Sequence, residues 1–141
     1  EKDGENITLI GMRDPGGIIK YMDSDDDREN ENVATRQILE PLTKDLRGFS
    51  ILLAHRPGPL DVYAECDLDV VFSGHLHGGQ IRLPYIGGIV TLIQNFCSGY
   101  DNGLYEEGDT QMVVSRGLGN SAFPFRINNK PEIVLAVLNQ G

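Results

Sequence analysis

Residues 49–79 read FSILLAHRPGPLDVYAECDLDVVFSGHLHGG, and this stretch decides the fold. Two almost wholly apolar runs, 49–55 and 70–73, are typical of strands that are covered on both faces. A short helix is predicted between them at 61–66. A strand, a helix and a strand in so short a stretch predict a βαβ unit with parallel strands and a right-handed crossover.

The residues before this unit predict one more strand and a longer helix. Residues 7–12 are apolar enough for a short buried strand. Residues 23–32 contain no apolar side chain, so we expect an acidic, solvated and mobile loop there. The apolar spacing from 33 to 46 predicts an amphipathic helix that is capped by Asn32. Pro41 predicts a kink or an early end in this helix.

The residues after the unit predict strands without helices. The β-rich segments, which are separated by Gly, Pro and Asn turns, are 80–83, 89–93, 111–115 and 132–138. No internal repeat is present in the sequence. We therefore expect a mixed α/β fold in which the βαβ unit is followed by antiparallel strands.

Composition and charge exclude several classes of protein. The 141 residues suit one domain or part of one, and 40% hydrophobic with 23% charged residues is ordinary for a globular protein. A formal net charge of -9 argues against nucleic-acid binding. No apolar run approaches the roughly 18 residues that a membrane span needs. Cys66 and Cys97 fit either redox compartment, and the start at Glu1 indicates a chain that has been cut.

The histidines of the chain all lie between positions 55 and 77. His55 follows the first strand of the βαβ unit, and His75 and His77 follow the second. Because ligands bind at the carboxyl ends of parallel strands, we expect the three imidazoles to converge at one edge of the sheet. In strand geometry, His75 and His77 would face one site together, with glycines around them. Imidazole side chains in this pattern predict a metal site.

Other interpretations of the polar residues stay open. A single histidine at a strand end is usually a packing or surface residue, so the metal prediction depends on the Gly-His-x-His-Gly-Gly string. Arg116, in a glycine-rich turn after a strand, is either a phosphate contact or one half of a salt bridge. A calcium loop from Asp23 is disfavoured, because Arg28 stands where glycine is needed and Ala34 where a glutamate belongs.

Residues 73–84, SGHLHGGQIRLP, resemble the Gly-His-x-His block of calcineurin-like metallophosphoesterases, in the bacterial branch where Gly-Gly-Gln follows. Residues 51–57, ILLAHRP, resemble the preceding histidine block of that family. Residues 114–119 and 126–133 resemble its C-terminal strands. The resemblance therefore extends over nearly the whole chain.

The resemblance implies a four-layer αββα sandwich that holds two divalent metal ions, which would be manganese, iron or zinc. It assigns His55 and His75 to the second metal and His77 to the first. It also implies hydrolysis of a phosphate-containing substrate, whether a phosphomonoester, a phosphodiester or a pyrophosphate. In such enzymes a metal-bound hydroxide attacks the phosphorus in line.

The chain departs from the family pattern in its missing N-terminal blocks. Its sequence lacks the Asp-x-His, Gly-Asp-x-x-Asp and Gly-Asn-His-Asp or Glu blocks, and partial matches at 108–112 and 119–121 are interpreted as coincidence. We therefore expect residues 1–141 to be the C-terminal half of a single phosphoesterase domain. Three histidines without the other ligands predict weak, mononuclear metal binding and no appreciable hydrolysis by this chain alone.

If the chain is half of a domain, we expect it to associate with a partner. Half of a sandwich would expose an apolar sheet face, so we expect either a bound N-terminal half or self-association. The alternative is a noncatalytic half-domain module that pairs with another chain and whose histidines bind a stray metal or nothing. The resemblance suggests a bacterial protein, in the cytoplasm or at the cell envelope, and any export signal or anchor would lie upstream.

Overall fold

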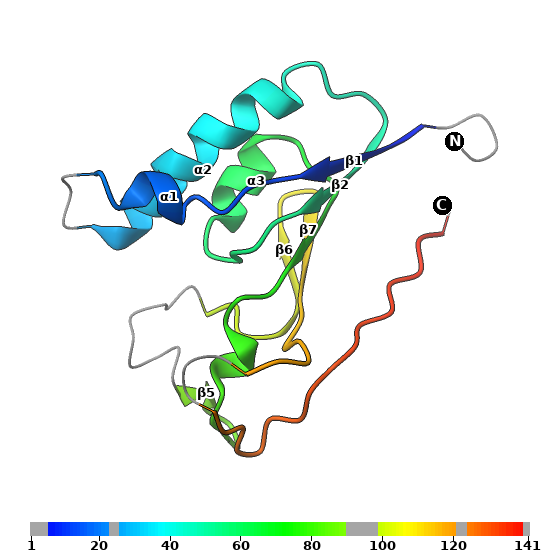
Figure 1. Ribbon diagram of the computed structural model, residues 1–141. Helices are drawn as coiled ribbons and strands as arrows, with labels where there is room; N and C mark the ends of the chain where they lie inside the picture. Colours follow the sequence, from blue (N-terminus) through cyan, green and yellow to red (C-terminus); the bar gives the residue numbers. More distant parts are fainter. Residues whose placement is uncertain (1–5, 23–25, 90–98, 121–123, 140–141) are drawn as a thin grey trace.

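The computed structural model describes residues 6–22, 26–89, 99–120 and 124–139. Its centre is a five-stranded sheet of order β1-β2-β3-β7-β6 (Figure 1). Strands β1, β2, β3 and β7 are parallel, and β6 pairs antiparallel with β7. This arrangement confirms the mixed α/β class. The antiparallel part of the sheet is the pair of β6 and β7, whereas β7, which was expected to be antiparallel, runs parallel to β3. The strands are β1 (Ile7–Gly11), β2 (Phe49–Leu53), β3 (Val70–Ser73), β6 (Gly103–Glu107) and β7 (Thr110–Val114).

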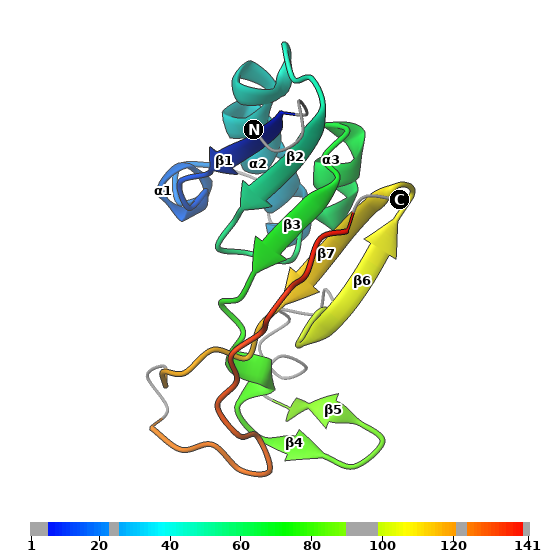
Figure 2. The same ribbon diagram turned by 90° about the vertical axis from the view of Figure 1, so that its right-hand side faces the viewer.

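The helices lie on one side of this sheet. In Figure 1 the longer helix α2 and the helix α3 lie on the same side of the strands, and Figure 2 shows both behind the sheet. Helix α3 connects β2 to β3, as the βαβ prediction requires. A small hairpin of β4 and β5 forms a second, separate sheet. The remaining elements are α1 (Gly16–Ile19), α2 (Asp27–Thr43), α3 (Leu60–Glu65), the 3-10 helix η1 (His77–Gly79), β4 (Arg82–Leu83) and β5 (Gly87–Gly88).

The core lies between the helices and the sheet face that they cover. Side chains alternate across a strand, so Leu52 is fully buried while Leu53 is 46% exposed. The same alternation leaves Leu9 of β1 65% exposed. One sheet face is therefore packed and the other is a bare apolar surface. The buried cluster is Ile10, Met12, Ile38, Leu39, Leu52, Ala54, Leu60, Tyr63, Leu68, Val71, Met112 and Val114.

The prediction of a mobile acidic loop at 23–32 is wrong from Asp26 onwards. Asp26 is the N-cap of α2, and its carboxylate accepts hydrogen bonds from the backbone N–H groups of Arg28 (3.0 Å) and Glu29 (3.1 Å). Acidic side chains are also stabilised at the positive end of a helix dipole. The charges that suggested a loop therefore favour an earlier helix start, and Pro41 lies inside the helix without ending it.

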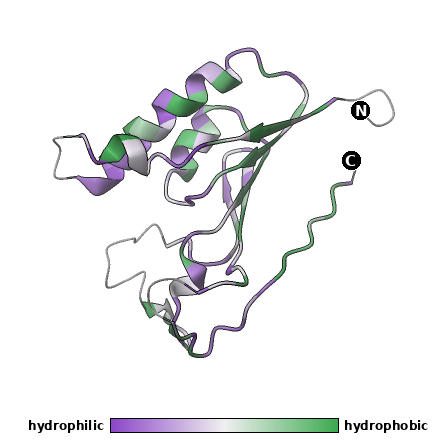
Figure 3. Cartoon of the chain, in the orientation of Figure 1, coloured by the Kyte–Doolittle hydropathy of each residue, from purple (hydrophilic) through white to green (hydrophobic). Residues whose placement is uncertain are grey.

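The predicted strand at 132–138 is also wrong in the structure as described. Its backbone runs extended on the side of the sheet away from the helices (Figure 1), and the N–H of Glu132 donates to the carbonyl of Gly117 (3.1 Å). Beyond that point Ile133 is 81% and Leu135 86% exposed, and Figure 3 shows the segment as hydrophobic. A strand needs a neighbour to hydrogen-bond with, and the described residues supply none here.

The other strand predictions have mixed outcomes. β7 appears close to the predicted 111–115, whereas only Arg82–Leu83 of the predicted 80–83 is a strand. The predicted strand at 89–93 falls almost wholly outside the described residues, and so does Cys97. β6 was not predicted. Within the described ranges, no helix is both long and apolar enough to cross a membrane.

Candidate metal centre

His55 and His75 meet at the carboxyl ends of neighbouring parallel strands. β2 ends shortly before His55 and β3 shortly before His75. Their ring centroids lie 4.4 Å apart, with the planes tilted by 57°. The carbonyl of His55 accepts hydrogen bonds from the Gly74 N–H (3.3 Å) and from the Ser73 hydroxyl (3.2 Å). The structure thus brings these two imidazoles together, as the strand ends predicted.

The half-buried ring of His75 is a neutral base. Burial, reinforced by the nearby charges of Arg56 and His55, lowers the pKa of His75 to about 4. The carboxylate of Asp14 acts in the opposite direction without cancelling the shift. At neutral pH the His75 imidazole therefore keeps a lone pair for a metal ion.

Asp14, which follows β1, is a site residue that the sequence analysis missed. Its Oδ2 lies 3.9 Å from Nε2 of His55. Arg56 donates two hydrogen bonds to the same carboxylate, from Nε to Oδ2 at 3.0 Å and from Nη2 to Oδ1 at 3.2 Å. Burial alone would raise the pKa of Asp14, but the hydrogen bonds from Arg56 and from the Gly16 N–H outweigh it and lower the pKa. The pattern that could have identified Asp14 is that β1 and β2 are both followed by polar residues.

His77 makes different contacts from this pair. It begins η1 with φ at +48°, and its Nδ1 lies 3.4 Å from Nη2 of Arg126. The prediction that His75 and His77 share strand geometry is wrong, because both have left-handed backbones and the chain turns after β3. Among the residues that the structure describes, no three His, Cys, Asp or Glu side chains gather so as to hold a metal ion.

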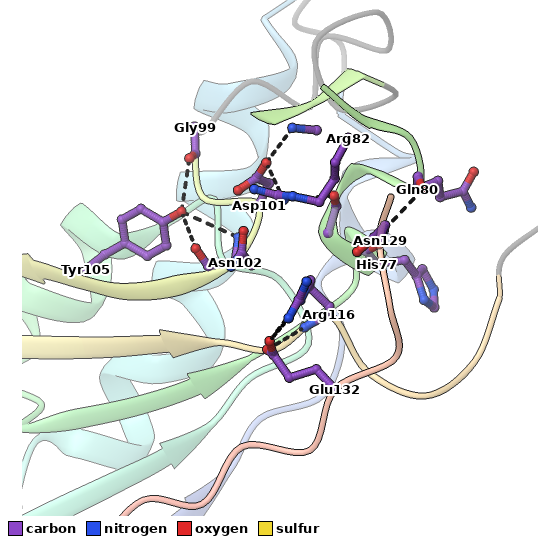
Figure 4. A network of polar contacts seen from close by, with 12 residues as sticks. His77, Gln80, Arg82, Gly99, Asp101, Asn102, Tyr105, Arg116, Asn129 and Glu132 are labelled. Atoms are coloured by element: carbon purple, nitrogen blue, oxygen red, sulfur yellow. Dashed lines mark hydrogen bonds and ion pairs between the residues drawn. The ribbon is translucent and has the colours of Figure 1, made fainter. Parts of the chain in front are cut away.

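A polar network holds the turn that carries His77, as Figure 4 shows. The buried amide of Asn129 donates to the carbonyls of His77 (2.7 Å) and Gln80 (3.2 Å). Gly78 lies in the left-handed region at φ +63°, and a Cβ there would come within 2.6 Å of the Arg116 side chain. The close approach explains why this position of the motif needs glycine. At Gly74, by contrast, a Cβ would meet only ordinary contacts.

Arg116 forms the salt bridge that was one of its two predicted roles. Its Nε donates to Oε2 of Glu132 at 2.8 Å, and its Nη2 also contacts Oε2. Hydrogen bonding from Arg116 lowers the pKa of Glu132. The pair anchors the start of the C-terminal segment beside η1, at the site end of β7 (Figure 4). A phosphate contact by Arg116 would therefore compete with Glu132.

The donor set suits one metal position better than two. His55 and His75 are adjacent imidazoles at one strand edge, and the lowered pKa of His75 leaves that ring unprotonated. They are the pair that the resemblance implies for the second metal position, and two imidazoles are fewer than the about three protein ligands of a catalytic metal. His77 faces a guanidinium, which repels a cation, so the described residues do not assemble the first position around it.

Comparison with known proteins gives relatives of one class. The chain is 41% identical over 92 residues to the uncharacterized metallophosphoesterase YkuE of Bacillus subtilis. This match covers 65% of this chain and 32% of YkuE. It is 32% identical over 88 residues to the phosphodiesterase YaeI of Escherichia coli, covering 62% of this chain and 32% of YaeI. It is also 38% identical over 92 residues to the UDP-2,3-diacylglucosamine pyrophosphatase LpxG of Chlamydia trachomatis, covering 60% of this chain and 27% of LpxG.

These matches confirm the resemblance to metallophosphoesterases. A longer match, 27% identical over 129 residues, is to the uncharacterized metallophosphoesterase YkoQ of Bacillus subtilis and covers 92% of this chain and 45% of YkoQ. The chain spans about a third of the length of YkuE and YaeI. No protein-family model and no solved structure matches it. The names of the relatives support a phosphoesterase family of hydrolases and imply divalent metal cofactors.

Proposed function

We propose that this chain supplies three histidine ligands, His55, His75 and His77, to a two-metal phosphoesterase. The supporting observation is the pair of adjacent imidazoles at the strand ends, one of them held neutral, in a chain that resembles metallophosphoesterases. The substrate would contain a phosphomonoester, phosphodiester or pyrophosphate bond. The metals would be two divalent ions, manganese, iron or zinc, which three imidazoles do not distinguish.

The resemblance assigns the roles of these residues, and the contacts in the structure say what each role would require. His55 and His75 would hold the second metal, which when bound supplies charge neutralisation for the phosphate. His77 would hold the first metal once its ring leaves Arg126. Arg116 would contact a phosphate oxygen if it exchanged Glu132 for the substrate. Both exchanges replace an intramolecular contact by a ligand contact, so neither needs a new element of structure.

Residues 1–141 would then be the C-terminal part of a single domain, weak in metal binding and inactive alone. Two of the three proposed ligands meet, whereas a catalytic metal usually has about three protein ligands. The bare sheet face and the C-terminal segment expose apolar side chains such as Leu9, Leu53 and Leu135. A surface of this kind favours pairing, here with the N-terminal half that carries the missing blocks.

A noncatalytic half-domain is the second candidate. The contact of His77 with Arg126 favours it, because in that arrangement the described residues complete no metal site. Such a module would use the bare face to pair with another chain and would need no phosphate chemistry. Its histidines would bind a stray metal or none.

The decisive experiment combines metal titration with an activity assay. Calorimetry of Mn²⁺ binding to purified 1–141 should show one weak site, which His55→Ala or His75→Ala abolishes and His77→Ala retains. Bis(p-nitrophenyl) phosphate with Mn²⁺ should be hydrolysed only after the upstream polypeptide is added. Hydrolysis at an enzyme-like rate by 1–141 free of that polypeptide would show that the chain is not a half-site. No hydrolysis by the reassembled protein would favour the module.

A further inference from the structure

The carboxylate of Asp14 is held in place by three hydrogen bonds from two groups. The Gly16 N–H donates to Oδ1 at 2.7 Å, and the guanidinium of Arg56 donates to both oxygens, at 3.0 and 3.2 Å. Arg56 is itself held on its other side by Glu31, with Nη1 to Oε1 at 3.5 Å. Because the fork of Arg56 is planar and matches a carboxylate, it fixes the direction of Asp14 as well as its position.

The ring of His55 lies beside this fixed carboxylate. Its side chain is 53% exposed, and its Nε2 lies 3.9 Å from Oδ2 of Asp14. That distance is too long for a hydrogen bond, so the half-exposed ring has to move closer to the carboxylate to form one. Histidines that bind metals usually donate their other ring N–H to a carboxylate or carbonyl, which fixes the tautomer and the ring orientation.

We propose that Asp14 is a positioning residue for His55: it accepts the Nε2–H and thereby leaves Nδ1 as the nitrogen that faces the metal. The inference rests on the proposed role of His55 as a ligand and adds which nitrogen binds and what orients it. Asp14 follows the end of β1 and His55 follows the end of β2, so the parallel pairing of these strands brings the two residues to the same edge of the sheet. The carboxylate itself does not touch the metal.

Two neighbouring glycines offer a matched pair of variants. A Cβ on Gly16 would come within 2.7 Å of Oδ1 of Asp14 and 3.0 Å of Nη2 of Arg56. Gly16→Ala should therefore disrupt the contact between Asp14 and Arg56 without removing a charge. A Cβ on Gly17 would meet nothing within 4 Å, and Gly17→Ala is the control in the same helix. Asp14→Ala removes the carboxylate, and Glu31→Gln removes the negative charge that pairs with Nη1 of Arg56 while leaving Asp14 in place.

The test is histidine side-chain NMR of ¹⁵N-labelled 1–141, first without metal and then with Zn²⁺. In the metal-free chain and in Gly17→Ala and Glu31→Gln, we expect a slowly exchanging proton on Nε2 of His55. Asp14→Ala and Gly16→Ala should lose it, while His77 stays unchanged. With Zn²⁺ bound, the metal shift should fall on Nδ1, and both disruptive variants should weaken Zn²⁺ binding about tenfold.

Two results would overturn the inference. One is zinc at Nε2 of His55, and the other is an Nε2 proton whose exchange is the same in Asp14→Ala as in the unaltered chain. Failure of the unaltered chain to bind Zn²⁺ would count against the proposed function instead. The metal-free spectra would still decide whether Asp14 orients the ring.

Discussion

The sheet core and the turn region around η1 are held together by different forces. In the core, apolar side chains such as Leu52 and Met112 are fully buried between the sheet and the helices. In the turn region, Asn129 bonds to backbone carbonyls, and Arg116 pairs with Glu132. Packing of apolar surface is non-directional, whereas each polar contact depends on one donor and one acceptor. We expect the core to determine stability and the turn region to determine the geometry of the site.

The difference divides the candidate metal centre between the two regions. His55 and His75 follow core strands, and their backbones are tied together by the Gly74 and Ser73 hydrogen bonds. His77 belongs to the turn region, where its carbonyl is held by Asn129. A substitution in the turn region should therefore move His77 and leave His55 and His75 in place.

The largest effect is expected from the core. Leu52→Ala removes a fully buried side chain and should lower the free energy of unfolding by about 2–5 kcal/mol. Leu53→Ala, one residue along on the bare face, is the matched control and should cost less than about 1.5 kcal/mol, because its side chain is already 46% exposed. Urea denaturation measures both. Equal losses would show that the bare face is covered in solution.

A smaller effect is expected from glycine in the turn region. Gly78→Ala and Gly108→Ala both place a Cβ on a left-handed backbone, at φ +63° and +58°, which costs about 1–2 kcal/mol each. A Cβ at Gly78 would also lie within 2.8 Å of three side-chain atoms, whereas at Gly108 it would meet nothing. Gly78→Ala should therefore cost about 1–3 kcal/mol more in thermal unfolding. Similar losses in the two variants would mean that the turn is not tightly packed.

The amide of Asn129 offers a test of site geometry. Asn129→Ala leaves the carbonyls of His77 and Gln80 without this donor and should cost about 1–3 kcal/mol. NMR should show larger shifts at His77 than at His55 or His75. Asn139→Ala, an exposed position, is the control and should change neither. Equal shifts at all three histidines would contradict the division between the two regions.

The smallest effect should come from protonation of His75. Its pKa is about 4 in the folded chain against 6.5 as the ordinary value, so the unfolded chain binds more protons between these pH values. The free energy of unfolding should therefore fall as the pH is lowered from about 6.5 to 4. His75→Gln should show a shallower fall over the same window. Because the ring is only half-buried, solvent screens part of the effect.

The sequence predicted the fold most reliably where apolar patterning was strong. Residues 49–55 and 70–73 contain β2 and β3, which are parallel and adjacent, because short apolar runs bounded by turn residues favour strands. The expected cover on both faces is not present among the described residues, since Leu53 of β2 is 46% exposed. The start of α2 was missed because its first turn is acidic, and the capping role of Asp26 was not considered. The segment at 132–138 has the composition of a strand, but its pairing depends on a neighbour that composition does not specify.

The candidate site was predictable to a similar degree. Two histidines at the ends of parallel strands had to lie close together, and the structure places them so. The turn after β3 was missed because strand alternation was extended through His77, whereas the left-handed backbone at His75 ends it. Asp14 was missed because its contact with His55 joins residues that follow two different strands and are far apart in sequence.

The sequence by itself determined the class of fold, the family resemblance and the identity of the donor side chains, because these depend on local pattern and composition. Only the tertiary structure decided which donors meet. Strand pairing brought Asp14 to His55 and His55 to His75, while the polar contacts of η1 turned His77 toward Arg126. Those contacts join residues that are distant in sequence, and their geometry is set by packing of whole elements.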